Sequence, residues 1–121
     1  MEKTIKVLMV EPLKEPYPAK VKNTLEGLQN AVGGLIEPIY MEKDVALVCN
    51  EEAKLIGLEG NRSLENDIIA GTFFVVGSND EGEFVSLPED KMLQYNERFQ
   101  KPEVFTKEQV DDTIGFTFIN F

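Results

Sequence analysis

The most hydrophobic stretch of this chain runs from Ile68 to Val76, and it constrains the fold more than any other segment. It is about half as long as a helix that crosses a membrane. Its residues, Ile-Ile-Ala-Gly-Thr-Phe-Phe-Val-Val, are mostly β-branched or aromatic and favour a buried strand. We therefore expect a central strand here, paired through the turn Gly77–Gly82 with residues Glu83–Val85.

The other apolar runs are short and predict further strands. They lie at Thr4–Val10, Leu35–Met41, Asp44–Asn50 and Lys54–Gly57, and in the aromatic segment Ile114–Phe121. In the last segment Phe116 and Phe118 share one face, while Ile119 and Phe121 share the other. Residues Leu58–Asp67 are mostly polar and predict a loop.

Three segments predict helices. Val21, Leu25, Leu28 and Val32 recur at helical spacing after a proline-rich loop, and Gly33-Gly34 is typical of a helix end. The patterns Ser86-Leu-Pro-Glu89 and Thr106-Lys-Glu-Gln109 are typical of capping boxes, the first before a helix with an apolar side and the second before one or two turns. The order of elements indicates an α+β fold, a mainly antiparallel sheet with two to three helices packed on one face, in a single domain over residues 1–121.

Composition excludes several classes of site. The 121 residues include no histidine and one cysteine, so histidine-dependent catalytic triads, histidine-ligated metals and an internal disulfide are all excluded. Cys49 lies in an apolar run and is expected in the core as an unreactive thiol. We expect a protein that is not an enzyme and that carries no cofactor or metal.

The acidic clusters are weak as cation sites. Glu51 and Glu52 follow Asn50 at the tip of an expected hairpin, where solvated carboxylates explain the pattern as well as a ligand does. The turn Asn79–Gly82 and the pair Asp111-Asp112 lack the spaced oxygen ligands that calcium requires. Asn50 and Glu51 stay candidates for partner contact.

Two loops carry the remaining candidate residues. Asn61 and Arg62 lie between glycine and serine, and Arg62 is one of only two arginines, so it can clamp an anion or form an internal salt bridge. Tyr17 stands between two prolines in the loop that begins at Glu11, either as a packed anchor or as an exposed contact.

Charge is distributed unevenly along the chain. Residues 1–50 carry 6 lysines and 7 acidic residues, whereas residues 51–121 carry 6 basic and 15 acidic residues, so the second part accounts for −9 of the net −10. Such a surface repels phosphate backbones and attracts basic ones. We expect a cytoplasmic protein that binds neither nucleic acid nor membrane directly.

Several motifs occur together in an order that resembles a known family. They are Lys6–Pro12, Glu15–Tyr17, Leu25–Gly34, Cys49–Leu55, Asn61-Arg62 and Asp67–Phe74. The chain is similar over residues 5–95 to a domain-of-unknown-function family found in phages, plasmids and conjugative elements of Gram-positive bacteria. Ala53 stands where that family leads us to expect glycine, and the family supplies no activity to carry over.

Two functions fit these observations. The first is a small acidic accessory protein of a mobile element that docks on a basic surface of a partner protein, where its carboxylates imitate nucleic acid charge. The alternative is a module that binds a small anionic or nucleotide-like ligand between loops 11–17 and 60–63. In either case the aromatic C-terminal strand offers an edge for a homodimer.

Overall fold

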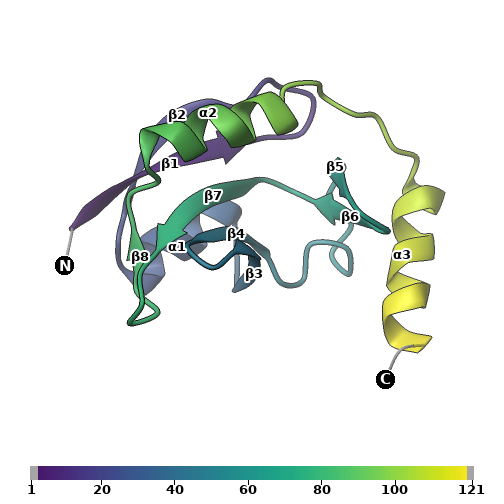
Figure 1. The fold of residues 1–121 in the computed structure, drawn as a ribbon. Helices are drawn as coiled ribbons and strands as arrows, with labels where there is room; N and C mark the ends of the chain where they lie inside the picture. The colour runs from purple at the N-terminus through teal and green to yellow at the C-terminus, as the bar shows by residue number, and fades with distance from the viewer. Residues whose placement is uncertain (1–2, 120–121) are drawn as a thin grey trace.

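A six-stranded antiparallel sheet forms the centre of the molecule (Figure 1). The computed structural model describes residues 3–119, and of residues 115–119 it describes the backbone alone. The strand order is β2-β1-β7-β4-β3, and β8 pairs with the end of β7. The strands are β1 (Thr4–Val10), β2 (Tyr17–Lys22), β3 (Ile36–Glu42), β4 (Val45–Asn50), β7 (Phe73–Ser78) and β8 (Phe84–Val85). This arrangement confirms the α+β class predicted from the sequence.

The most hydrophobic stretch contributes the central strand, as predicted, but it also turns a corner. All residues of β7 are buried between β1 and β4. The strand β6 (Asp67–Ala70) precedes it and belongs to a separate two-stranded sheet. Between them Gly71 has φ +75°, and a Cβ there would lie 2.8 Å from Leu58 Cδ1. Only glycine fits this corner without strain.

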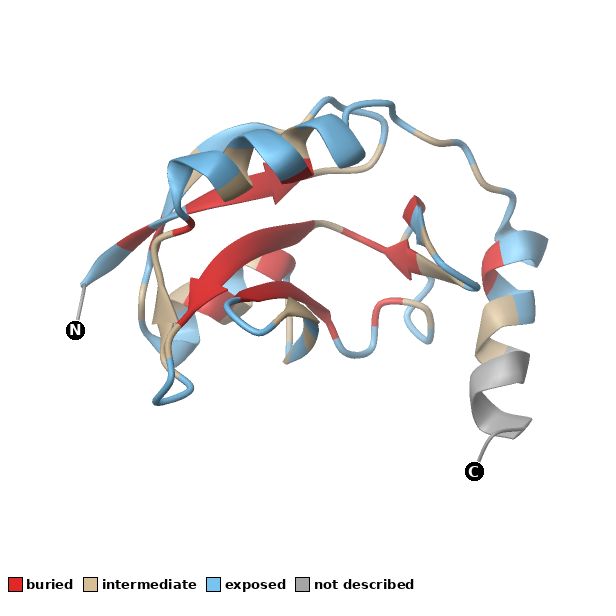
Figure 2. Cartoon of the chain, viewed as in Figure 1, coloured by how far each residue is buried: buried red, intermediate tan, exposed pale blue. Residues whose placement is uncertain are grey.

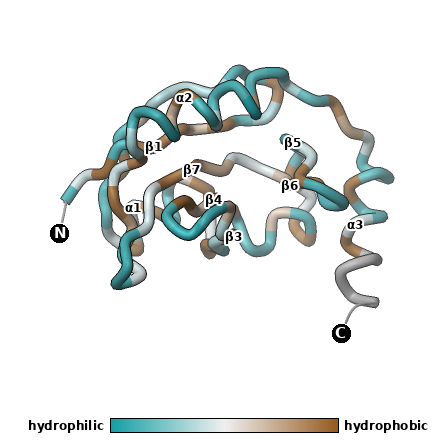
Figure 3. The backbone as a smooth tube through the Cα atoms, viewed as in Figure 1, coloured by the Kyte–Doolittle hydropathy of each residue, from teal (hydrophilic) through white to brown (hydrophobic). Residues whose placement is uncertain are grey.

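Helices cover both faces of the sheet, so the expectation that they share one face is wrong. Along β1, Val7 and Met9 pack toward α1 (Leu25–Val32), while Leu8 and Val10 pack toward α2 (Glu89–Arg98). Successive strand residues point to opposite faces, and here both sets are apolar. Figure 2 shows β1, β4 and β7 as buried, and Figure 3 shows the same strands as hydrophobic. Two covering helices are therefore needed, one on each face.

The segment after the first loop is a strand rather than the start of a helix. Residues 17–22 pair with β1, and Val21 lies opposite Ile5. The helix α1 begins only after Thr24, whose Oγ1 accepts a hydrogen bond from Gly27 N at 3.0 Å. Pairing with β1 therefore determines the structure of this segment, although the spacing of Val21 fits a helix. The predicted end of the helix is confirmed, since Gly33 caps it with φ 79°.

The region between β4 and β7 differs most from the sequence prediction. Residues 51–57 form successive turns, so the expected hairpin with a return strand at Lys54–Gly57 is wrong. The expected polar loop contains instead the strand β5 (Gly60–Leu64), which pairs with β6. Because β5 is buried at its start, Asn61 and Arg62 lie inside the molecule, while Ser63 is exposed.

The two capping patterns behave differently. Ser86 Oγ accepts a hydrogen bond from Lys6 N at 2.9 Å, and α2 begins after Pro88 without a side-chain cap. Thr106 and Gln109 do form the reciprocal box, with Gln109 N donating to Thr106 Oγ1 at 3.1 Å. The first pattern therefore ties the chain to β1, and the second opens α3 (Lys107–Ile119).

The C-terminal segment is a helix, so the expected strand Ile114–Phe121 is wrong over residues 114–119. The side chains of Phe116, Phe118 and Ile119, and the whole of Phe121, lie outside the described residues. Val110 of α3 packs on the hairpin β5–β6 together with Phe105. A homodimer through an aromatic edge strand loses its basis, because that strand does not form.

Candidate functional site

Arg62 is buried in the structure and holds three segments together. Its relative exposure is 1%. Nε donates to Phe99 O at 3.0 Å, one terminal nitrogen donates to Lys14 O at 2.6 Å, and the other donates to Asn61 O at 3.2 Å and Asn61 Oδ1 at 2.8 Å. The guanidinium thus binds carbonyl groups in place of the expected salt bridge. Burial lowers the pKa of Arg62, and the nearby Glu103 opposes that change.

Asn61 completes this polar cluster. Its Nδ2 donates to Val10 O and to Gly71 O, both at 2.9 Å, and its side chain is fully buried. Asn61 and Arg62 therefore fasten β5 to the end of β1 and to the end of α2. Loops 11–17 and 60–63 are indeed neighbours, as the ligand-module hypothesis requires, but their contact is closed by these hydrogen bonds.

Glu11 and Tyr17 lie together at the surface. The Tyr17 hydroxyl donates a hydrogen bond to a Glu11 carboxylate oxygen, and Lys14 Nζ lies 3.6 Å from the other oxygen. This hydrogen bond, with burial and the Glu11 charge, raises the pKa of Tyr17 to about 12. Tyr17 is 40% exposed, so it is both an anchor of the loop and an accessible ring.

A cavity lies between the main sheet and the hairpin β5–β6, and its lining includes the sequence candidates Asn50 and Glu51. Its volume is about 680 Å³. Acidic residues come from four positions, Glu37, Glu51, Glu52 and Asp67, and one basic residue, Lys54, lies among them. Apolar walls are formed by Leu35, Ile39, Leu55, Ile68, Ile69 and Ile114. We call this site the acidic pocket.

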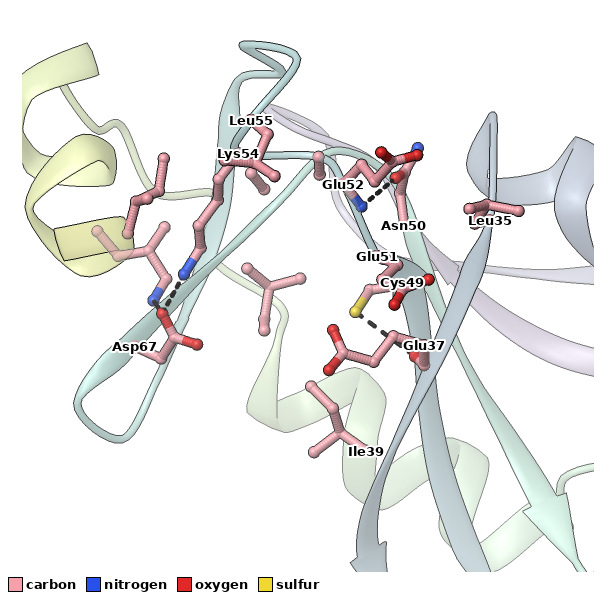
Figure 4. A pocket seen from close by; sticks show the side chains of 15 residues that line it. Leu35, Glu37, Ile39, Cys49, Asn50, Glu51, Glu52, Lys54, Leu55 and Asp67 are labelled. Atoms are coloured by element: carbon pink, nitrogen blue, oxygen red, sulfur yellow. Dashed lines mark hydrogen bonds and ion pairs between the residues drawn. The ribbon is translucent and has the colours of Figure 1, made fainter. Parts of the chain in front are cut away.

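The charges of the acidic pocket are not balanced. Lys54 Nζ forms an ion pair with Asp67, and no other ion pair among the described residues involves a carboxylate of the pocket. Glu37 reaches inward from the opposite wall (Figure 4). Burial, then the charges of Glu51 and Asp67, raise the pKa of Glu37 despite the pull of Lys54. The pocket therefore holds surplus negative charge.

Two buried residues shape the acidic pocket from behind. Asn50 accepts a hydrogen bond from Glu52 N at 2.8 Å and donates to Val32 O at 3.3 Å, so it fixes the turn that carries Glu51 and Glu52. The Cys49 thiol faces the Glu37 carbonyl, with Sγ 3.6 Å from that oxygen. Burial, with the charges of Glu37 and Asp67, raises the pKa of Cys49 to about 12, and the thiol is buried as predicted.

Sequence reasoning missed Glu37, Lys54 and Asp67. Glu37 reaches the acidic pocket because β3 pairs with β4 and places it opposite Cys49. Asp67 arrives through the hairpin β5–β6, which the sequence did not predict. The one signal available was a glutamate inside the apolar strand Leu35–Met41, where a charged side chain must face solvent or a cavity.

The carboxylates of the pocket are spread along its walls. Across the described residues no group of three or more histidine, cysteine or acidic side chains is arranged to hold a metal ion. Among residues 3–119, none of the helices has both the length and the hydrophobicity of a membrane span.

Comparison with known proteins adds one finding. No curated protein and no solved structure matches the chain. One family model does match, over most of the chain but short of α3. The protein belongs to the family described as a domain of unknown function, DUF3846, whose model matches residues 5–100.

Proposed function

We propose that this protein is an accessory protein of a mobile element that acts by binding a basic segment of a partner protein in the acidic pocket. One observation carries the proposal. A cavity of about 680 Å³ is lined by four carboxylates and a single ammonium group, which is already paired with Asp67. Three carboxylates therefore stay available for a cationic guest.

The lining suits lysine and arginine side chains in particular. These side chains have apolar stems and a charged end, so the stems can lie against Leu35, Ile39 and Leu55 while the ends reach the carboxylates. Burial raises the pKa of Glu37, and the repulsion from the carboxylates of Glu51 and Asp67 raises it further. A bound cation relieves that repulsion, which favours binding.

The charge of the whole chain supports the same kind of partner. Fifteen acidic residues against six basic ones in residues 51–121 attract a basic surface from a distance and increase the rate of encounter. A host protein that handles nucleic acid presents such a surface, and the carboxylates would then imitate phosphates. The resemblance to a family of phages, plasmids and conjugative elements supports the mobile-element role.

The experiment measures binding of octa-lysine and octa-arginine peptides by calorimetry. The variant E37Q/E51Q/E52Q is compared with E26Q/E89Q/E97Q, which removes the same charge from α1 and α2. We expect the pocket variant to weaken binding about tenfold or more and the control variant to weaken it about twofold, since close charge pairs contribute more than distant ones. Equal losses in the two variants would contradict the proposal.

Salt gives an independent check of the mechanism. Affinity of the native chain should fall by about tenfold between roughly 50 mM and 500 mM salt, because screening shortens the reach of exposed charges. Peptide binding that is unchanged across this range would show that burial of apolar surface drives the interaction. That outcome would remove the role given to the carboxylates.

A further inference from the structure

Three lysines from different parts of the sequence form a row on β1 and β2. The register of the two strands places Lys6 directly opposite Lys20, and Lys22 lies opposite Thr4 on the same face. Residues opposite one another in an antiparallel pair have Cβ atoms about 5 Å apart. We call Lys6, Lys20 and Lys22 the lysine row.

The lysine row has no internal partner within the described part of the chain. All three side chains are exposed, and none of the ion pairs found among residues 3–119 includes them. Like charges placed directly opposite each other destabilise a sheet. In a chain of net charge −10, three adjacent uncompensated ammonium groups are therefore an exception that an external anion would stabilise.

The lysine row and the acidic pocket lie at opposite ends of the sheet. The row lies on β1 and β2, at one end of the strand order, and the pocket begins at β3, at the other end. The row carries three positive charges, and the pocket carries three carboxylates that Lys54 does not pair. The strands β7 and β4 lie between β1 and β3, so they keep the two surfaces apart within one molecule.

We infer that the lysine row of one copy of this chain binds the acidic pocket of a second copy. This inference rests on the proposed function, because it uses the same pocket for the same kind of guest. A phosphate polymer is disfavoured as the partner of the row, because the acidic remainder of the molecule repels it. The chain itself supplies an anionic surface of matching charge.

The contact uses different surfaces on the two copies, so each bound copy still has one free surface. Such head-to-tail contacts build an open series rather than a closed dimer. The two edge strands contain Pro18 and Pro38, which have no N–H to offer a neighbouring strand. Side chains, rather than continued strand pairing, therefore make this contact.

The test is sedimentation of the full chain at about 50 mM and about 500 mM salt, where screening differs strongly. At low salt we expect a concentration-dependent mass at least about twice the monomer value of 13.6 kDa, and at high salt the monomer. The variant K6Q/K20Q/K22Q and the variant E37Q/E51Q/E52Q should each stay monomeric alone. Mixed in equal amounts, they should form a dimer and nothing larger, because each supplies one intact surface.

The control variant K43Q/K101Q/K107Q removes the same charge from other exposed lysines and should associate like the native chain. Association that survives K6Q/K20Q/K22Q, or a mixture that stays monomeric, would overturn the inference. If the native chain binds octa-lysine but never self-associates, the inference fails while the proposed function stands. If the row binds oligothymidylate in place of a second copy, the partner assigned here is wrong.

Discussion

The cluster around Arg62 and the acidic pocket are both rich in polar groups, yet they have opposite relations to their surroundings. In the first, buried nitrogens bind carbonyl oxygens of three separate segments at 2.6 to 3.2 Å. In the second, burial raises the pKa of Glu37, and the neighbouring carboxylates of Glu51 and Asp67 raise it further. Fully bonded polar groups stabilise the fold, whereas uncompensated ones are available to a ligand.

The comparison also separates two regions that look alike in the sequence. Asn61-Arg62 and Asn50-Glu51 are both polar pairs beside short apolar runs. The first pair is buried in β5, and in the second pair the amide is buried while the carboxylate faces the pocket. The charged member is therefore buried in the pair that stabilises the fold and faces the cavity in the pair that we propose binds a partner.

The largest expected effect comes from removing the Arg62 guanidinium. Arg62→Met keeps the size of the side chain but leaves the carbonyls of Phe99, Lys14 and Asn61 without a donor. We expect a loss of roughly 3 kcal/mol in the free energy of unfolding, measured with urea. Arg98→Met serves as control, since Arg98 is exposed and its guanidinium lies over the Phe99 ring. A native-like stability in Arg62→Met would contradict the structural role.

Asn61→Ala should have a smaller effect of the same kind. The change removes the two hydrogen bonds that Asn61 donates, to Val10 O and Gly71 O, and the one that its Oδ1 accepts from Arg62. We expect a loss of about 2 kcal/mol in the free energy of unfolding. Hydrogen exchange of β5 and β6 amides should accelerate more than that of β7. Uniform acceleration across all strands would mean that Asn61 does not specifically fasten the hairpin.

The smallest effects concern pH, and they have opposite signs at two glutamates of β3. The pKa of Glu37 is raised in the folded chain above its ordinary value of 4.5, so the folded state binds the carboxyl proton more tightly than the unfolded state does. This tighter binding stabilises the fold at low pH, and the stabilisation is lost as pH rises above 4.5 through the folded pKa. Hydrogen bonds from Lys91 and Tyr95 lower the pKa of Glu42, so its contribution is present above 4.5 and is lost as pH falls through the lower folded pKa.

Urea midpoints measured from about pH 3 to about pH 8 test both directions. Glu37→Gln should reduce the decline in stability above pH 4.5, and Glu42→Gln should reduce the decline below it. Each variant is the control for the other, because both remove one carboxylate from the same strand. Identical pH profiles for the two variants would show that the pocket environment does not perturb Glu37.

Local patterns predicted much of the central sheet but little of the region between β4 and β7. β1, β3 and β4 begin and end within a residue or two of the apolar runs that predicted them. The sequence prediction placed Val21 in a helix, because its spacing from Leu25 and Leu28 fits one. In the structure Val21 pairs with Ile5, so residues 17–22 form a strand. Asn61 and Arg62 were misread because polar residues beside glycine usually mark a loop.

The acidic pocket could not be assembled from the sequence, although two of its residues were candidates. Asn50 and Glu51 were identified beside each other, and Glu37 and Asp67 lie 14 and 16 residues from Glu51. Strand pairing of β3 with β4 brings the first to the pocket, and the hairpin β5–β6 brings the second. No local pattern encodes such pairings, because they depend on the register of distant segments.

The sequence alone determined the α+β class, the buried central strand, the inert cysteine and the surplus of negative charge, because these follow from composition and from short-range periodicity. The tertiary structure decided which charges meet. It buried Arg62 among carbonyl groups and aligned three lysines across β1 and β2. It also brought carboxylates from β3, from β6 and from the turn that follows β4 to the walls of one cavity. Electrostatic interactions depend on distance in space, and the folded chain alone fixes that distance.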